Sequence, residues 1–300
     1  MALLTSQAAT ERTTARPYGR LKPGTVKYTS IYIFLGIYAL FTIIVFVWVA
    51  LMSLKTNADV LRFPPWHLPS EWQWENFSRA WEGGLANMFK NSMFVAGFGT
   101  VFSVTISCFA AYPIARIKFR LAHPLLLFFL IGIMIPYMLT AIPLYMKIED
   151  IRQQYDIDSR LILVVLYTVS GFSFNTYVMT GFYKTLPHEM EEAATLDGAS
   201  PFRTFWQVML PLVRPGIASL AILNFVSLWN EFFYALIFTH DASNYTVTLG
   251  LVVLDQQAVY SGKWVVLFAS MTLTMIPVLI IFAVLQRQIV RGLAVGAIKG

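Results

Sequence analysis

Long apolar intervals without charged side chains dominate the pattern of the sequence. Five intervals contain no Asp, Glu, Lys or Arg: residues 28–54, 91–115, 121–146, 161–183 and 264–286. A sixth interval, residues 215–240, contains one charged residue, Glu231. A helix needs about 20 mostly apolar residues to cross the hydrocarbon core of a bilayer. The pattern therefore predicts an all-α integral membrane protein with six transmembrane helices, near residues 31–53, 88–112, 123–146, 161–183, 212–238 and 264–286.

Two of these spans carry residues that bear on packing. In the second span, small residues recur at every fourth position from Gly99 to Ala111, which lets another helix approach closely. The third span contains Gly132, Pro136 and Pro143. Proline removes a backbone donor and clashes with the preceding turn, so we expect a bend there. The bend can line a cavity or can be an adjustment of packing.

Composition supports the membrane class and excludes others. The chain has 57% hydrophobic and 13% charged residues, whereas a soluble domain has about 25% charged residues. Its formal net charge of +6 does not indicate a nucleic-acid partner, because the basic residues lie in short clusters between the apolar intervals. Cys108 is the single cysteine and the four histidines are dispersed. We therefore expect no disulfide, no metal site and no catalytic residues.

The distribution of basic residues predicts the orientation in the membrane. Fourteen of the 22 lysines and arginines lie in the terminal segments and in the loops after spans two and four, and eight lie in the other loops. Cytoplasmic loops carry an excess of Lys and Arg. We therefore expect both termini in the cytoplasm, with residues 1–29 as a basic tail, residues 30–286 as the transmembrane domain and residues 287–300 as a C-terminal tail.

The cytoplasmic loop between spans four and five predicts two short helices. Thr185 is expected to cap the first helix, with Pro187 in its first turn. Gly198 can end this helix, because glycine adopts the left-handed conformation without strain. Ser200 would then cap the second helix, with Pro201 at its first position.

The same loop, residues 186–211, resembles that of the membrane subunits of ATP-binding-cassette (ABC) importers. In that family the loop has Glu-Ala-Ala, three residues, Gly, nine residues and then Ile-x-Leu-Pro. The matching residues here are Glu192, Ala193, Ala194, Gly198, Val208, Leu210 and Pro211. Valine in place of isoleucine is the one departure. The resemblance implies a type I ABC importer permease fold, in which about residues 187–196 form a cytoplasmic coupling helix.

The resemblance also implies roles for residues of this loop. The candidate ATPase-coupling residues are Glu192, Ala193, Ala194, Asp197, Gly198, Ala199 and Pro211. Glu192 would anchor the helix by charge-assisted hydrogen bonds, while Ala193 and Ala194 would permit close approach to an ATPase. The chain lacks a phosphate-binding loop, since its Gly262-Lys263 pair is followed by tryptophan. No cofactor is therefore expected in this chain, and ATP and magnesium would be bound by partner ATPase subunits.

Further residues are similar to the carbohydrate branch of the family, the maltose-type permease subunit. They are Trp229, Asn230, Glu231, Phe232, Leu249, Gly250, Pro277, Gln286, Arg287 and the closing residues 296–300. The resemblance runs from about residue 30 to the end. It implies a sugar-importing permease in the bacterial cytoplasmic (inner) membrane. The implied partners are a second homologous permease subunit in a heterodimer, two ATPase subunits and an extracytoplasmic solute-binding protein.

The fifth span is expected to present a polar face. Asn224, Ser227, Glu231 and Tyr234 recur at helical spacing, and Asn230 adjoins them. An ionisable residue inside a membrane is costly and faces protein or a water-filled path. These residues are candidates for the translocation path or for contact with the partner permease. A wet position of Glu231 at the outer interface is the third alternative.

Two competing functions stay open at this point. A secondary transporter driven by an ion gradient would need no coupling loop and would usually show an internal repeat of broken helices. The sequence has no visible repeat of that kind. Among importers, a polyol or glycerol phosphate is the alternative solute to a sugar.

Overall fold

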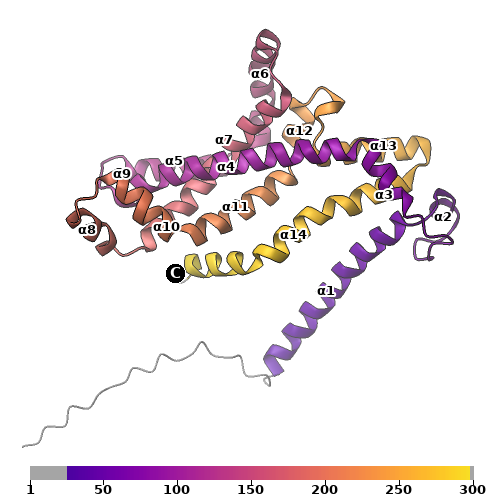
Figure 1. The fold of residues 1–300 in the computed structure, drawn as a ribbon, viewed down its shortest axis with the longest axis horizontal. Coiled ribbons are helices and arrows are strands. Elements are labelled where there is room, and N and C mark those ends of the chain that lie inside the picture. Colours follow the sequence, from indigo (N-terminus) through magenta and orange to yellow (C-terminus); the bar gives the residue numbers. More distant parts are fainter. Residues whose placement is uncertain (1–25, 298–300) are drawn as a thin grey trace, which may run out of the picture. The chain divides into compact units, whose positions relative to one another are not determined.

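The computed structural model describes residues 26–297, which contain helices and connecting loops and no strand (Figure 1). The elements are α1 (Val26–Ser53), α2 (Asn57–Arg62), α3 (Glu75–Ala80), η1 (Trp81–Leu85), α4 (Ala86–Arg116), α5 (Ala122–Met134), η2 (Tyr137–Thr140), α6 (Ala141–Tyr155), α7 (Ser159–Thr185), α8 (Glu189–Leu196), α9 (Pro201–Thr204), η3 (Phe205–Met209), α10 (Leu210–Leu212), α11 (Arg214–Trp229), α12 (Phe233–Phe238), η4 (Ala242–Asn244), α13 (Val247–Ser261) and α14 (Trp264–Ala297). Most of the predicted basic tail, residues 1–25, and residues 298–300 lie outside the described residues.

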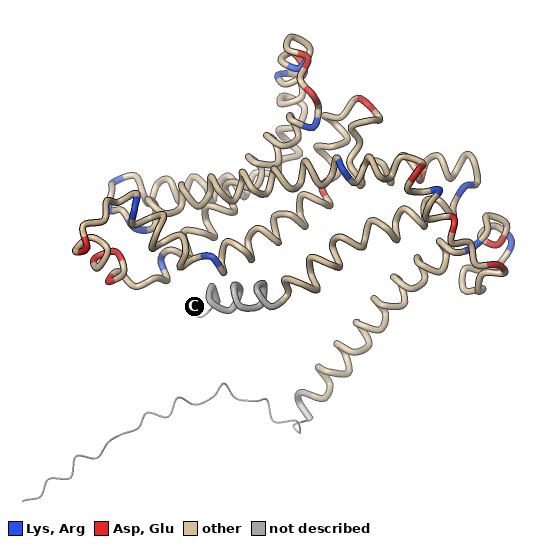
Figure 2. The backbone as a smooth tube through the Cα atoms, viewed as in Figure 1, with Lys and Arg blue, Asp and Glu red and all other residues tan. Residues whose placement is uncertain are grey.

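Several helices are long and apolar enough to cross a bilayer. Four segments qualify alone: Thr29–Ser53, Glu75–Arg116, Ser159–Thr185 and Trp264–Gln286. Two bent pairs qualify together, Ala122–Met134 with Tyr137–Tyr155 and Pro201–Leu212 with Arg214–Trp229. Most charged residues lie in the loops and toward the helix ends (Figure 2). The described chain thus has four candidate spans, or up to six if each bent pair is one span, which agrees with the predicted class.

The predicted bend in the third span is found at Pro136. Helix α5 ends at Met134, and the chain turns by 84° before continuing through η2 into α6. Ile135 has an extended backbone, with φ −80° and ψ 116°. The residue before a proline avoids the helical region because the proline ring would clash with it. In contrast, Pro143 lies inside α6, which projects from the neighbouring helices (Figure 1).

The prediction of one continuous fifth span over residues 212–238 is wrong. Helix α11 ends at Trp229 and α12 begins at Phe233, with a short irregular segment between them. The Glu231 carboxylate accepts hydrogen bonds from the amides of Tyr234 (2.8 Å) and Ala235 (3.3 Å). These are amides of the first turn of α12, which has no earlier helical carbonyls to bond. Glu231 therefore starts a new helix instead of continuing the old one.

Two differences concern the segments around the sixth span. The stretch between the fifth and sixth spans, which was expected to be a loop, contains the helix α13. This helix has 15 residues, so it is too short to have been predicted as a span. Gly262, with φ +69°, ends this helix, and its amide bonds to the Ala258 carbonyl. The sixth helix, α14, runs to Ala297. The predicted C-terminal tail, residues 287–300, is therefore helical through residue 297.

The core forms where α4 packs against α7. A Cβ atom added at Gly99 would lie 2.9 Å from Cβ of Tyr167, so the small residue lets the two helices approach. This confirms the packing predicted from the small-residue pattern. Opposite faces expose large apolar side chains, such as Val101 on α4 (58% exposed) and Val165 on α7 (61% exposed). Exposed apolar faces of this kind suit lipid.

Candidate functional site

The loop between spans four and five folds into a pair of short helices, but the first begins differently from the expectation. Thr185 is the last residue of α7, and its hydroxyl donates to the Phe182 carbonyl at 2.8 Å. It therefore does not cap α8. His188 precedes α8 and makes no side-chain capping bond. Three acids in the first turn, Glu189, Glu191 and Glu192, instead lie at the positive end of the helix dipole.

The end of α8 agrees with the prediction. Gly198 has φ +79°, in the left-handed region. The amide of Ala199 bonds to the Ala194 carbonyl at 2.9 Å, and the amide of Gly198 bonds to the Thr195 carbonyl at 3.0 Å. These two bonds form a Schellman motif, which satisfies the last carbonyls of a helix. The glycine is needed because a residue with a Cβ atom is strained at this φ.

The second helix of the loop also begins as predicted. The Ser200 hydroxyl accepts a hydrogen bond from the amide of Arg203 at 3.3 Å, and Pro201 is the first residue of α9. The chain then continues through η3 into α10, which contains Pro211. The loop is thus a helix-turn-helix whose turn is fixed by local hydrogen bonds.

The predicted coupling residues differ in exposure. Glu192, Ala193, Asp197 and Gly198 are exposed, Ala199 is half-buried and Ala194 is buried. Two apolar side chains that the motif does not include are also exposed, Leu196 at 89% and Phe202 at 68%. Because α8 buries Ala194 against the protein and exposes Leu196, its outer surface is available to another protein.

The charge-assisted bonds that hold α8 come from Glu191, whereas the expectation assigned them to Glu192. Arg116 is the last residue of α4. Its Nε group donates to Glu191 Oε2 at 2.8 Å, and its Nη2 group lies 2.8 Å from the same oxygen. The Arg116 side chain is only 2% exposed. Glu192, one residue further, is exposed. This contact was not predictable from local patterns because the two partners are 75 residues apart.

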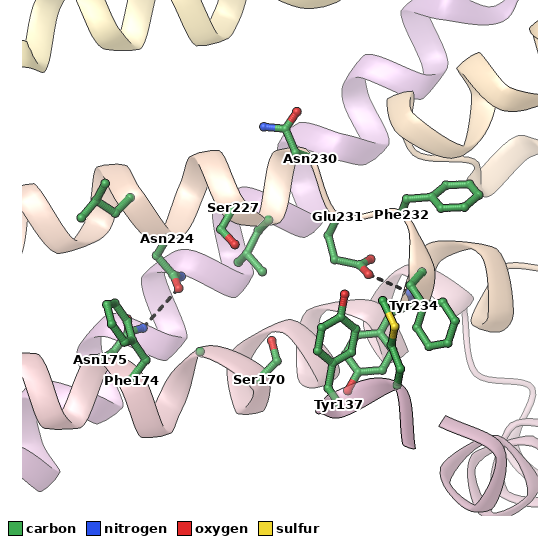
Figure 3. Close-up of a pocket in the computed structure, with 15 residues that line it drawn as sticks. Tyr137, Ser170, Phe174, Asn175, Asn224, Ser227, Asn230, Glu231, Phe232 and Tyr234 are labelled. Carbon is green, nitrogen blue, oxygen red and sulfur yellow. Dashed lines mark hydrogen bonds between the residues drawn. The ribbon is translucent and has the colours of Figure 1, made fainter. Parts of the chain in front are cut away.

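A second candidate site is an open cavity of about 560 Å³ lined by residues of α7, α11, α12 and η2 (Figure 3). Its lining includes all five residues proposed for the fifth span, namely Asn224, Ser227, Asn230, Glu231 and Tyr234. They do not share one helical face, since the helix breaks between Trp229 and Phe233. The break and the turn of the chain into α12 nevertheless direct them to the same cavity.

The sequence did not indicate the opposite wall of the cavity. Tyr137, Ser170, Phe174 and Asn175 belong to η2 and α7 and face the fifth span (Figure 3). Asn175 is fully buried, and its Nδ2 group donates to Ser103 Oγ at 2.9 Å and to Asn224 Oδ1 at 3.3 Å. A buried asparagine in a span was the signal that could have drawn attention to this wall.

Two amide atoms, one on each wall of the cavity, have no partner among the described residues. They are Oδ1 of Asn175 and Nδ2 of Asn224. Gly171 makes room for the amides, because a Cβ atom there would lie 2.7 Å from Asn224 Oδ1. A buried polar atom without a hydrogen bond is destabilising. The pair therefore leaves one acceptor and one donor unsatisfied and buried beside the cavity.

Glu231 supplies the negative charge at the other end of the cavity. It is half-buried, and its Oε2 atom accepts a hydrogen bond from the Tyr167 hydroxyl at 2.6 Å. The Tyr137 and Tyr234 rings stand beside it, with their centroids 5.1 Å apart. The cavity thus combines aromatic faces, hydroxyls and amides with a single charged side chain.

Comparison with known proteins identifies the class of this helical protein. Residues 103–295 match a protein family described as "binding-protein-dependent transport system inner membrane component". The chain belongs to this family, whose members are permease subunits of ABC importers. The resemblance inferred from the cytoplasmic loop is thereby confirmed. A membrane location is likewise supported by the family and by the apolar helices.

Several relatives have names that state a substrate, and three of them illustrate the range. The diacetylchitobiose uptake system permease protein NgcG of Streptomyces coelicolor is 30% identical, over 88% of this chain and 86% of that protein. The melibiose/raffinose/stachyose import permease protein MelC of Bacillus subtilis is 29% identical, over 83% and 88%. The sn-glycerol-3-phosphate transport system permease protein UgpE of Yersinia pestis is 30% identical, over 79% and 85%.

A solved structure shares the fold. It is the crystal structure of a bacterial ABC transporter involved in the import of the acidic polysaccharide alginate. The TM-score is 0.73 at 20% sequence identity, and the match covers 88% of this chain and 99% of the other. The predicted ABC importer permease fold is thus confirmed, and the binding-protein-dependent family implies solute-binding and ATPase partners.

Proposed function

We propose that this chain moves a sugar or oligosaccharide across the cytoplasmic membrane, after an external binding protein delivers it. The observation that carries the proposal is the intramembrane cavity, whose lining joins aromatic rings with amides and hydroxyls. Sugars present hydroxyls at their edges and C–H groups on their faces, which such a lining can bond and cover. The names of the diacetylchitobiose and melibiose relatives support the same solute class.

The proposed path uses both walls of the cavity. The unpaired acceptor of Asn175 and the unpaired donor of Asn224 would bond a sugar hydroxyl or a pair of neighbouring hydroxyls. Ser227, Asn230 and Tyr234 would extend this polar surface toward Glu231. A site of this kind binds weakly enough to release solute, because few of its groups are charged.

Energy would come from a separate ATPase through the cytoplasmic helix pair. The exposed surface around Glu192, Ala193, Leu196 and Asp197 would fit a cleft on an ATPase subunit. Gly198 would keep the turn that orients this surface, and Ala199 and Pro211 would hold the following helices. The working complex would contain a second homologous permease and two ATPase subunits that bind ATP and magnesium. Both termini would lie in the cytoplasm, as the basic residues predict.

Glycerol phosphate is the second candidate solute, because one relative carries that name. The lining of the cavity argues against it. Its one charged side chain is the carboxylate of Glu231, and like charges repel strongly where water is scarce. A neutral sugar avoids this repulsion. Membership of the binding-protein-dependent family also favours ATP over an ion gradient as the source of energy.

Solute uptake by the reconstituted complex tests the proposal. Proteoliposomes with the partner subunits and the cognate binding protein should accumulate labelled diacetylchitobiose or melibiose but not labelled glycerol 3-phosphate. The Asn224→Ala substitution should lower sugar uptake, while Asp255→Ala, on the exposed face of α13, should not. Uptake of glycerol 3-phosphate alone would reject the sugar assignment.

A further inference from the structure

The Arg116 guanidinium joins three elements at the cytoplasmic end of the protein. It belongs to the last turn of α4, and its Nη1 and Nη2 groups donate to the carbonyls of Leu186 (2.9 Å) and Pro187 (3.1 Å). These two residues form the link between α7 and α8. The same guanidinium pairs with Glu191 in the first turn of α8. One side chain therefore bonds the end of one span, the exit from a second span and the exposed short helix.

The geometry of this contact favours rigidity. Arginine presents its donors in a planar fork, so several bonds fix both its position and its orientation. The Arg116 side chain is 2% exposed and that of Glu191 is 19% exposed, so water competes little for the bonds. An exposed ion pair would tolerate wide movement, whereas a buried pair with additional carbonyl bonds does not.

We propose that Arg116 is a positioning residue that makes α8 move as one body with α4 and α7. The inference rests on the proposed function, in which an ATPase displaces α8. Displacement of a helix held only by its flexible link would be absorbed by that link. With Arg116 in place, the bonds to Glu191 and to both link carbonyls pass the displacement to the ends of the two spans.

The test measures the distance between α8 and α4 in the assembled complex. Spin labels at Thr195→Cys and Val101→Cys, in a Cys108→Ala background, report this distance, since both positions are exposed. The distribution of distances between the two labels is recorded without nucleotide and again after trapping with magnesium, ATP and vanadate. In the unsubstituted complex we expect one narrow distribution that is the same in both states.

The decisive variant is Arg116→Gln, and its matched control is Lys118→Gln. Both remove one positive charge from the same inner segment, but Lys118 is exposed. We expect the distribution to broaden and to shift on trapping in Arg116→Gln, while the ATPase still co-purifies. Lys118→Gln should match the unsubstituted complex. Identical, narrow distributions in Arg116→Gln would overturn the proposal.

Two further variants keep the test decisive. If Arg116→Gln does not assemble, Arg116→Lys carries the test, because lysine keeps the charge but cannot bond the carboxylate and both carbonyls together. It should broaden the distance distribution relative to the unsubstituted complex, and no broadening overturns the proposal. Glu192→Gln should leave the distribution unchanged, since Arg116 bonds Glu191. Failure of the ATPase to co-purify with the unsubstituted chain would reject the proposed function instead.

Discussion

The Tyr167 hydroxyl donates a 2.6 Å hydrogen bond to the Glu231 carboxylate, across the boundary between α7 and the broken fifth span. The other oxygen of this carboxylate accepts the amide of Tyr234, so Glu231 both starts α12 and fastens it to α7. The Thr248 hydroxyl donates to the Glu231 backbone carbonyl at 2.7 Å. A single acidic residue thus fixes the break that turns the fifth span toward the cavity.

Substitution of Glu231 should therefore affect transport in a graded way. Glu231→Gln keeps one oxygen that can accept the amide of Tyr234, and its Nε2 group can donate to the Tyr167 hydroxyl oxygen, so we expect a modest loss of uptake. Glu231→Leu leaves the Tyr167 hydroxyl and the amides without their acceptor, which costs about 1–3 kcal/mol for each buried group. Uptake in proteoliposomes should fall much further in this variant. Unaltered uptake in both variants would mean that the residue has no part in the path or in the break.

The close approach of α4 and α7 predicts that substitution of two glycines of α4 will have different effects on the stability of the protein. Gly99→Val should destabilise the protein by about 1–3 kcal/mol, because the added atoms collide with Tyr167 and overpack the contact. Gly97→Val is the matched control, since a Cβ atom there meets nothing within 4 Å. Thermal unfolding in detergent should show a lower midpoint only for Gly99→Val. Equal midpoints would contradict the packing.

The second half of α6 should contribute stability that depends on pH. Arg152 and Gln153 donate hydrogen bonds to Glu149, and they lower its pKa to about 2 against the opposing effect of burial. His240 also lies 3.4 Å from this carboxylate. An unfolded glutamate has a pKa of about 4.3. Since the folded pKa is the lower one, the stabilisation is complete above about pH 4.3 and disappears as the pH falls toward 2.

The substitution Glu149→Gln measures this contribution. It should lower the midpoint of thermal unfolding at neutral pH, and the gap to the unsubstituted protein should close as the pH falls from about 4.3 toward 2. Asp150→Asn is the control, because Asp150 is exposed and adjacent. A gap of constant size at every pH would show that the ion pair is not its source.

The proposed orientation predicts which residues each side of the membrane can reach. Single cysteines at Ser200 and at Ser70, in a Cys108→Ala background, should react with a membrane-impermeant maleimide from opposite sides. Both positions are exposed. In intact cells only the Ser70→Cys variant should be labelled, and Ser200→Cys should become reactive after the cells are opened. Labelling of both in intact cells would reject the orientation with cytoplasmic termini.

Local signals in the sequence were sufficient for the turn between the two short helices, but not for the start of the first, because Thr185 belongs to α7. Gly198 and Ser200 act through bonds to residues a few positions away, so their roles could be predicted and were confirmed. The break at Glu231 depends on Tyr167 and Thr248, which lie far along the chain. Its effect on the fifth span was therefore not predictable from helical spacing.

The candidate sites follow the same division. The residues of the fifth span that line the cavity were recognisable as polar side chains in an apolar interval. Asn175 and Tyr137 on the opposite wall become neighbours of the fifth span only through the packing of α7 and the bend at Pro136. The Arg116 contact likewise joins segments 75 residues apart, and the resemblance to the family motif directed attention to Glu192 instead of Glu191.

The central claim is that the helix pair α8 and α9, joined by the turn at Gly198, couples an ATPase to transport. Gly198→Val places a β-branched residue at φ +79°, which strains the turn and displaces the exposed surface of α8. Gly181→Val, inside α7 with nothing within 4 Å of an added Cβ atom, is the matched control.

The most direct measurement is the rate of ATP hydrolysis in proteoliposomes with and without sugar-loaded binding protein, beside the amount of ATPase that co-purifies. In Gly198→Val we expect membrane insertion to be normal, and stimulation of hydrolysis to be lost or the ATPase to be absent from the complex. Gly181→Val should keep both. Full stimulation and full co-purification in Gly198→Val would contradict the coupling role of this loop.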